Sequence, residues 1–425
     1  MTERNAAAAR RRGQLGWALF DWANSPFTTL IITFVFATYF AQGVVGDAVR
    51  GQALWSTVMA LAGLAIALLA PVLGAIADAS GARKPWIGGL TLLCAAASFG
   101  LWFVAPDPGY VILALVLVVL ANFGFEFGAV FANALLPDIA EPKRLGRLSG
   151  WSWGLGYAGG LAALVLALTL FIQPAEPPFG LDADAAEQVR ITGPLVAAWL
   201  LLSSLPLFLF TPDRPSRKVT LAAAVREGLG SVATTVKALP QQRHLLRFLL
   251  ANMLYSNGLI TLFGLGGVYA SGVFGMSLTE VIQFGIALNV AAGLGAFAFG
   301  ILDDRIGSRR TVLLALLGLI AAATLAVLAP DVTWLWVAGI GIGVFVGPIQ
   351  AASRSLMARM AIPETAAGHF GLFALSGRAT AFLGPAAVAA ATAASGSQRA
   401  GIAMIILFLA AGFALLIGVK EPGRR

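Results

Sequence analysis

Three polar residues in an otherwise apolar stretch are the first candidates for chemistry. Asn122, Glu126 and Asn133 lie within residues 110–136 at spacings of four and seven, which places them on one face of a helix. An ionisable group inside a membrane-spanning helix costs about 2.5–3.5 kcal/mol on insertion scales, so it needs a function or a partner. Glu126 is therefore either a carboxylate that carries protons or binds a substrate cation, or half of a static ion pair that fixes helix packing.

Asp21, Asn24 and Thr28 form a second polar stripe, at spacings of three and four. For Asp21 the alternative to a function is an N-cap at the start of a helix. Arg378 lies about nine residues into the apolar stretch 369–393. We expect its depth to match that of Glu126, so these two groups could form an ion pair. Alternatively, Arg378 could bind a substrate carboxylate.

A short loop occurs twice in the chain. GAIADASGARK at Gly74–Lys84 returns as GILDDRIGSRR at Gly300–Arg310, and both copies read G-x-x-x-D-x-x-G-x-basic-basic. The two copies of the loop lie 226 residues apart, and other repeated positions lie 221 to 224 residues apart: Ala-Pro-Asp at 105–107 and 329–331, Pro142 and Pro363, and Gly150 and Gly371. The repeat indicates two homologous halves.

The repeated loop has a physical rationale. Its glycines permit a tight turn and close helix approach. Its aspartates, Asp78 and Asp304, can oppose the positive N-terminus of a neighbouring helix, and the basic pair at the lipid surface can bridge to them. Such contacts form in one conformation and break in another, which predicts a gate; the alternative is a charged turn that only sets topology. The other predicted gate residues are Gly74, Gly81, Arg83, Lys84, Asp138, Gly300, Arg305, Gly307, Arg309 and Arg310.

Composition sets the class of protein. Hydrophobic residues make up 59% of the 425 residues and charged residues 11%, against about 25% charged residues in soluble proteins. Windows of about 20 apolar residues can each span a bilayer. The sequence predicts an all-α polytopic membrane protein with about 12 transmembrane helices in two six-helix pseudo-repeats, at 17–42, 53–77, 86–105, 110–136, 150–172, 191–211, 246–270, 280–302, 311–329, 333–357, 369–393 and 400–419.

These spans divide the chain into five segments. A cytoplasmic tail, a six-helix bundle, a basic cytoplasmic linker, a second six-helix bundle and a final cytoplasmic tail are predicted at 1–16, 17–211, 212–245, 246–419 and 420–425. Within the linker, an amphipathic helix at Leu221–Leu239 is expected to lie on the inner membrane surface. The arginines before the first span resemble a signal peptide, but the apolar stretch is too long, which predicts an uncleaved first span.

The basic charge follows the membrane topology. With the N-terminus inside, all but four of the 28 Lys and Arg residues lie on the cytoplasmic side; Arg50, Arg190 and Arg399 lie outside and Arg378 lies within a span. This is the positive-inside bias of an inserted protein, so the expected partners of these residues are membrane lipids rather than nucleic acid. The prediction is a multi-pass protein of the plasma (inner) membrane with both termini in the cytoplasm.

Several chemistries are excluded or disfavoured. The sequence contains no Walker A motif and no soluble segment that could hold a nucleotide-binding domain, which excludes ATP-driven transport by this chain. We expect His244 and His369 to face the surface at membrane edges, without a second metal ligand, and Cys94 to be a small buried hydrophobe. No span contains a catalytic constellation, so the sequence predicts no metal, no cofactor and no enzyme.

The repeated loop resembles motif A of the major facilitator superfamily, and the similarity covers nearly the whole chain. The first copy has Ala79 where an Arg commonly follows the aspartate, whereas Asp304-Arg305 in the second copy keeps the pattern. In the family an acidic residue at the end of span four joins this charge cluster, and Asp138 occupies that place. Ala79 leaves the charge relay of the first half incomplete.

Two further segments resemble the Atg22-like (UMF1) branch of that superfamily. They are Trp17–Ser25 (WALFDWANS) and Leu148–Gly160, whose body reads SGWSWGLGYAGG. The branch includes a fungal vacuolar amino-acid effluxer. The glycines of the second segment predict close helix packing.

The resemblance implies a secondary transporter that moves a small solute by alternating access. It favours amino acids and efflux, with protons as the coupling ion. Spans one, four, seven and ten line the central cavity in this superfamily, and spans seven and ten carry matching polar residues: Asn252, Ser256, Gln350, Ser353 and Arg354. The alternatives are a lipid or drug exporter of the same fold, and a scaffold or sensor that transports nothing.

Overall fold

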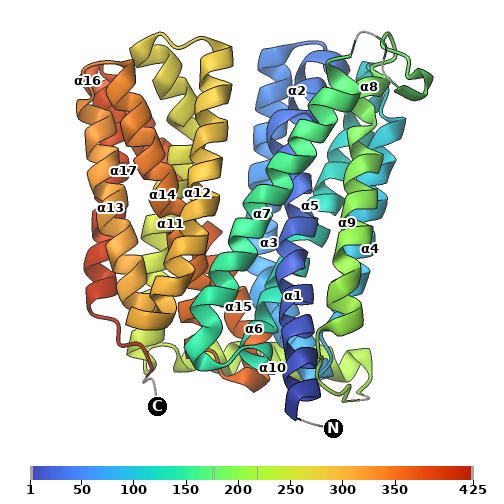
Figure 1. Ribbon diagram of the computed structural model, residues 1–425, viewed down its shortest axis with the longest axis vertical. Helices are drawn as coiled ribbons and strands as arrows, with labels where there is room; N and C mark the ends of the chain where they lie inside the picture. Colours follow the sequence, from blue (N-terminus) through green and yellow to red (C-terminus); the bar gives the residue numbers. More distant parts are fainter. Residues whose placement is uncertain (1–2, 175, 177, 218, 423–425) are drawn as a thin grey trace. The chain divides into compact units, whose positions relative to one another are not determined.

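The computed structural model describes residues 3–174, 176, 178–217 and 219–422 (Figure 1). Within these residues every regular element is helical, and twelve helical segments are long and apolar enough to cross a membrane. The predicted fold class is therefore confirmed. Residues 1–2 and 423–425 of the predicted tails, and residue 218 of the predicted linker, lie outside the described part of the chain.

Contacts divide the chain into two compact units, which are described separately. The first comprises Met1–Ile66, Ser80–Leu135 and Leu155–Lys218, and the second comprises Ala67–Ala79, Leu136–Gly154 and Val219–Arg425. Two helices of the first sequence half thus contribute one end each to the second unit. They are α3 (Ala48–Ser80) and α7 (Leu145–Leu166).

The first span begins earlier than predicted. Helix α1 covers Glu3–Pro26 and continues into a π-helical segment at Phe27–Phe34. The alanines and arginines before residue 17 favour a helix, so the chain is already helical there. Asp21 consequently lies inside α1, and its interpretation as an N-cap is wrong. The π-helical turns that follow are of a kind often found at functional sites.

In the first unit, α4 (Lys84–Gly100) packs against α5 (Val111–Ala134) and α9 (Thr192–Phe210). Helix α1 contacts both α5 and α9. The Trp17 indole donates to the Ala132 carbonyl at 2.6 Å, and the rings of Trp22 and Trp199 stack with centroids 5.4 Å apart. These contacts bring the polar stripes of α1 and α5 onto neighbouring helices.

Glycines of α7 allow its second part to approach α1 closely. A Cβ at Gly159 would collide with the backbone of Trp22, and one at Gly156 would press on the Ser25 hydroxyl. Cys94 is 1% exposed in the same unit. The predicted close packing of the glycine-rich segment and the burial of Cys94 are both confirmed.

The second unit contains the remaining spans, which Figure 1 shows in yellow to red. Their bounds are α11 Arg243–Phe274, α12 Leu278–Ile306, α13 Ser308–Leu328, α14 Val332–Met360, α15 Ala366–Arg378, α16 Leu383–Ser395 and α17 Gln398–Ile417. The eleventh span is interrupted between α15 and α16. There the Asn257 amide of α11 donates to the Thr380 hydroxyl at 2.6 Å, which satisfies a polar group at the interruption.

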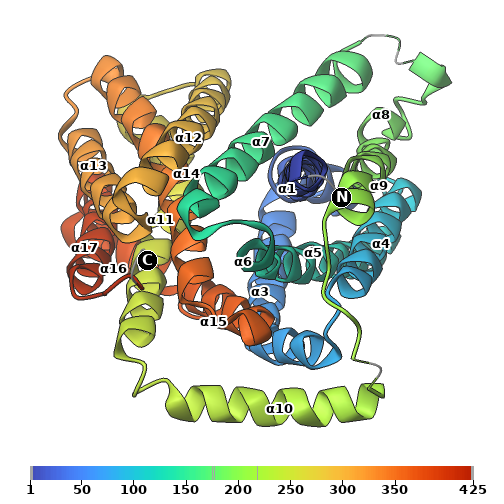
Figure 2. The same cartoon turned by 60° about the horizontal axis from the view of Figure 1, so that its bottom comes forward.

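The linker helix was placed correctly from the sequence. Helix α10 covers Leu221–Ala238, one residue shorter than predicted, and the Thr220 hydroxyl caps it by accepting from Ala223 N at 3.3 Å. It crosses the end of the second unit near the start of α11 (Figure 2). The repeated Ala-Pro-Asp also has a structural role, because Asp107 and Asp331 each cap the helical turn that follows.

A stripe of small residues joins α12 and α14. Gly339, Gly343 and Gly347 recur every four residues on α14, and a Cβ at each would collide with α12. A Cβ at Gly347 would collide with the Ala292 carbonyl, which belongs to the backbone and cannot rotate away as a side chain can. Such stripes let helix backbones approach within a bilayer.

We predict that Gly347→Ala lowers the thermal stability of the protein, because the added methyl overpacks a backbone contact at a cost of about 1–3 kcal/mol. Gly285→Ala on α12 is the matched control, since nothing lies within 4 Å of a Cβ there. Thermal unfolding in detergent should show a lower Tm only for Gly347→Ala. Equal Tm values for the two variants would contradict the close approach of α12 and α14.

Candidate functional site

The aspartate of the first repeated loop binds the start of another helix. Asp78, near the end of α3, accepts hydrogen bonds from Ala367 N at 3.1 Å and Gly368 N at 2.8 Å. Both amides belong to the first turn of α15, whose N–H groups have no partner within the helix. The carboxylate also opposes the positive end of the α15 dipole. This is the interaction that the sequence predicted for the repeated aspartate.

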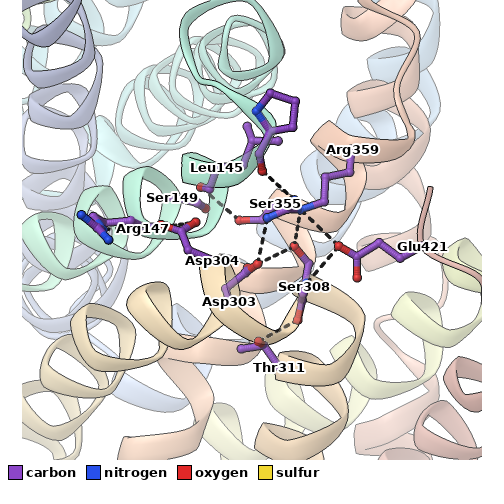
Figure 3. A network of polar contacts seen from close by, with 12 residues as sticks. Leu145, Arg147, Ser149, Asp303, Asp304, Ser308, Thr311, Ser355, Arg359 and Glu421 are labelled. Carbon is purple, nitrogen blue, oxygen red and sulfur yellow. Dashed lines mark hydrogen bonds and ion pairs between the residues drawn. The ribbon is translucent and has the colours of Figure 1, made fainter. Parts of the chain in front are cut away.

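The second copy makes the same interaction with α7. Asp304, near the end of α12, accepts from Arg147 N at 3.1 Å and lies 3.4 Å from the Arg147 Nε (Figure 3). The two aspartates are 226 residues apart, and Gly368 and Arg147 are 221 apart. The repeat therefore exchanges helix ends: each sequence half supplies a carboxylate to a helix of the other. We call this end of the second unit the loop end.

Glycines bring the same helices together. A Cβ at Gly74 would collide with the backbone of Ala367, and one at Gly150 would collide with Ala296 and Gly300. The α3–α15 and α12–α7 crossings are thus close, and they occur at equivalent positions of the repeat. This is the close helix approach that the glycines of the repeated loop predicted.

Arg359, at the end of α14, connects several groups of the loop end (Figure 3). Its guanidinium lies 3.2 Å from Asp303 Oδ1 and 3.3 Å from Glu421 Oε1, and it donates to the Pro142 carbonyl at 2.7 Å and the Ser308 hydroxyl at 2.9 Å. The side chains of Arg359 and Asp303 are 5% and 1% exposed. Removing either partner of a buried ion pair leaves a charge without compensation.

Sequence reasoning missed Arg359, although a signal was present. Arg359 follows Asp138 by 221 residues, which is the repeat offset in this region. The second half therefore has a base where the first half has an acid. That base, Arg359, lies beside Asp303. Asp303 itself corresponds to Ala77 in the first half.

Two further carboxylates were also missed. Asp213, which follows the sixth span, accepts from Arg83 N at 3.0 Å and Lys84 N at 2.8 Å. Glu421, which follows the twelfth span, accepts from Ser308 N at 3.2 Å and Arg309 N at 3.0 Å. In each half, an acidic residue that follows the last span thus caps the N-terminus of the third span. An acidic residue shortly after each last span was the available signal.

The basic pairs of the repeated loop bind backbone carbonyls near helix C-termini. Arg83 donates to the Ala134 carbonyl at 2.8 Å, and Lys84 donates to the Phe208 carbonyl at 3.0 Å. In the second copy, Arg309 donates to the Ile417 carbonyl at 2.6 Å. Arg83 is completely buried, so the expectation that it stays at the lipid surface is wrong. Cations at helix C-termini are favourable because they oppose the negative end of the dipole.

The polar residues of the first unit lie at different depths of burial. Asn122 and Asn24 are 4% and 6% exposed, whereas Glu126, Asn133 and Asp21 are partly buried. Asp21 faces Gly156 of α7, where the glycine leaves room for it. These residues belong to α1 and α5, which contact each other. The first unit thus places two carboxylates on adjacent helices within the membrane-spanning part of the fold.

Arg378 is the last residue of α15 and is exposed within the second unit. Glu126 belongs to the first unit. Each residue is therefore placed only within its own unit, and the ion pair between them stays a prediction.

Polar residues of spans seven and ten form contacts inside the second unit. Asn252 donates to the Ser376 hydroxyl at 2.8 Å, and the hydroxyls of Tyr255 and Ser353 lie 2.7 Å apart. Arg354 is 3% exposed. It donates to the Ser149 hydroxyl at 2.8 Å and to the Ser149 carbonyl at 2.7 Å, and it stacks on Trp153 at 5.6 Å. In this conformation these groups hold helices together.

One histidine prediction was wrong. His369 is 4% exposed, and its Nδ1 lies 2.8 Å from the Thr365 carbonyl. The sequence placed it correctly near a helix start, but the side chain is buried there, beside a small pocket that residues of α10 also line. Within the described residues no group of three or more His, Cys, Asp and Glu side chains could hold a metal ion.

Twelve spans, an internal repeat and exchanged carboxylate contacts define a transporter of the major facilitator type. The chain belongs to the Atg22-like family, described as "Vacuole effluxer Atg22 like", which matches residues 41–147 and 141–424. It is therefore an integral membrane transporter and not an enzyme.

Curated relatives agree with this assignment. The chain is similar to an uncharacterized MFS-type transporter, YxiO, of Bacillus subtilis, with 25% identity over 95% of this chain and 94% of the relative. It is also similar to autophagy-related protein 22-1 of Neosartorya fischeri, with 26% identity over 67% of this chain and half of the fungal protein.

Solved structures share the fold. The human organic anion transporter MFSD10 matches 96% of this chain and 99% of its own, with a TM-score of 0.72 and 17% identity. The proton:xylose symporter XylE matches 98% and 97%, with a TM-score of 0.71 and 12% identity. Members of this fold thus move small solutes, and some couple that movement to protons.

We predict that Asp304→Asn loosens the contact between α7 and the end of α12. The test places a cysteine at Ala351 in a Cys94→Ala background. Ala351 is 3% exposed, and its carbonyl accepts a hydrogen bond from Ser149 of α7. Losing a charged acceptor of backbone N–H groups costs about 1–3 kcal/mol. We expect labelling of the cysteine by a water-soluble maleimide to become about tenfold faster.

Asp331→Asn is the matched control, because Asp331 caps α14 outside the exchanged contacts. It should leave the labelling rate unchanged. If both variants labelled at the same rate, Asp304 would have no special role in holding α7.

Arg359 and Asp303 should behave as a coupled pair. Arg359→Gln alone leaves Asp303 buried with less compensation, which we expect to cost about 3–5 kcal/mol. The double variant with Asp303→Asn should be less destabilised than the sum of the two single variants. Thermal unfolding of the wild type, the two single variants and the double variant measures the coupling free energy. Additive effects would show that the interaction between Arg359 and Asp303 contributes nothing to stability.

Proposed function

We propose that this protein is a secondary active transporter that moves a small solute by alternating access. The exchanged contacts of Asp78 with α15 and Asp304 with α7 support this proposal most directly. Each contact joins the two sequence halves at one end of the spans. Each consists of hydrogen bonds that can break without unfolding a helix, as a gate requires.

In this proposal the loop residues form a gate that closes when both contacts are made. Carboxylate–helix contacts contribute about 0.3–2 kcal/mol each. Two such contacts can bias an equilibrium between open and closed states without preventing exchange between them. The two sequence halves, 17–211 and 246–419, would move against each other around a site near the bilayer midplane, as in other repeat-built transporters.

Protons are the proposed coupling ion. Glu126 and Asp21 are carboxylates within spans of the first unit, where an ionisable group is costly and therefore marks a functional site. Asn122, Asn24 and Asn133 share the same two helices and would bind polar parts of the solute. The proton coupling of a structural neighbour, the xylose symporter, is compatible with this choice.

Amino acids are the proposed substrates and efflux the proposed direction. The family description "Vacuole effluxer Atg22 like" supports efflux. Arg378, a cation within the eleventh span, would bind the solute carboxylate. The proposed location is the plasma (inner) membrane, with both termini and the loop end in the cytoplasm, in agreement with the positive-inside distribution of Lys and Arg.

Uptake into proteoliposomes tests the proposal. A pool of labelled amino acids is offered with and without an imposed pH gradient of either sign. Gradient-driven accumulation by the wild type that Glu126→Gln abolishes would support proton coupling through Glu126. Asp184→Asn, which neutralises an exposed loop carboxylate, is the control and should transport normally.

Two outcomes would count against parts of the proposal. Accumulation that survives Glu126→Gln would assign Glu126 to packing. Folded protein that moves no amino acid would overturn the substrate proposal and favour a lipid or drug exporter of the same fold. A protein that moves none of these solutes would favour a scaffold or sensor.

A further inference from the structure

The linker helix α10 has an apolar stripe that no part of its own unit covers. Ala222, Leu229, Ala233 and Val236 are exposed, and Leu229 and Val236 are each 50% exposed. Their spacings of seven, four and three place them along one side of the helix. An exposed apolar stripe of this kind indicates a surface for lipid or for a partner.

A neighbouring side of α10 packs on the second unit. Ala224 is 2% exposed, and a Cβ at Gly228 would collide with the backbone of Ile76 on α3. Ile76 lies one turn before α3 ends at Ser80. Helix α10 therefore lies beside the last turn of a membrane-spanning helix, about 6 Å before the end of that helix.

The packed side of α10 lies close to the contact between Asp78 and α15. Ser231 and Thr235 of α10 line a small pocket together with Asp78, Gly368 and His369. The hydrogen bond from Gly368 N to Asp78 thus lies at a pocket that α10 helps to line.

Basic residues border the apolar stripe. Arg226 and Lys237 are exposed. About the helix axis, they lie less than a quarter turn from the apolar stripe. Long basic side chains in this position extend their charge to phosphate groups while their stems lie along apolar surface. Each basic residue near a membrane surface increases the preference for anionic lipid roughly fivefold.

We propose that the exposed side of α10 binds anionic phospholipids of the leaflet at the loop end, and that these lipids hold α10 over the Asp78–α15 contact. The apolar stripe enters the acyl boundary, and Arg226 and Lys237 bind the head groups. The continuity of α10 with the membrane-embedded α11, only four residues away, selects lipid over a soluble partner.

A fluorescent label tests the depth of the stripe. Val236→Cys in a Cys94→Ala background is labelled with bimane and reconstituted into vesicles that contain brominated phosphatidylcholine. Thr234→Cys, exposed on a different side of α10, is the control. Brominated lipid should quench the label at 236 strongly and the label at 234 weakly. Equal quenching at both positions would overturn the proposal.

Head-group preference tests the role of charge. Quenching of the label at 236 is compared between brominated phosphatidylglycerol and brominated phosphatidylcholine in mixed vesicles. The preference for the anionic lipid should fall about 25-fold in Arg226→Gln/Lys237→Gln. It should persist in Arg226→Lys/Lys237→Arg, which keeps the charges, and in Lys143→Gln/Arg144→Gln, which removes two charges elsewhere.

A preference that survives Arg226→Gln/Lys237→Gln would refute the anionic-lipid site, as would no preference in the wild type. A variant that failed to fold would be recognised by its elution profile, and the charge-conserving swap would then decide. None of these measurements involves a transported solute. The result therefore stands or fails independently of the proposed substrate.

Discussion

A carboxylate placed at the N-terminus of a helix is the interaction on which the loop end depends. Asp78 and Asp304 each accept backbone N–H groups from a helix of the other sequence half. Asp213 and Glu421 do the same for a helix of their own half. The bond type is the same in all four places, but its consequence differs. Contacts within a half stabilise each bundle, whereas in the proposed gate the contacts between halves break when the bundles separate.

The exchanged contacts depend on glycines and on buried charge. Gly74 and Gly150 allow backbones to come close enough for a short carboxylate to reach the helix end. In the second half, Arg359 adds a buried cation beside Asp303 and joins it to Glu421. That charge cannot be left unpaired without a large cost. In the second half the loop end is therefore held by a buried network in addition to helix capping.

Much of this arrangement could be predicted from the sequence. Apolar windows gave twelve spans and the linker helix, and the repeated loop gave the role of Asp78 and Asp304 as helix-capping groups. The repeat also places Arg359 at the position that corresponds to Asp138. Because the two residues differ in charge, similarity between the two halves does not reveal this base. Glu421 and Asp213 act across more than a hundred residues, so no local pattern reveals their partners.

Two errors concerned residues expected near the start of a helix. Asp21 was weighed as an N-cap because its helix was expected to begin at residue 17, yet the helix begins at Glu3. His369 was placed at the surface because it lies near a helix start, yet its side chain is 4% exposed, beside a pocket that α10 helps to line. Position along the chain predicts depth in the membrane, but it does not predict which other element covers a residue.

In the proposed transport cycle, α7 separates from the ends of α12 and α14. Spin labels at Lys143, just before α7, and Lys420, just after α17, report this motion directly, because both positions are exposed. Pulsed electron–electron double resonance in lipid should show two populations of the distance between the labels. The ratio of these populations should change with pH or with a transported solute. A single distance that stays the same under every condition would contradict the account.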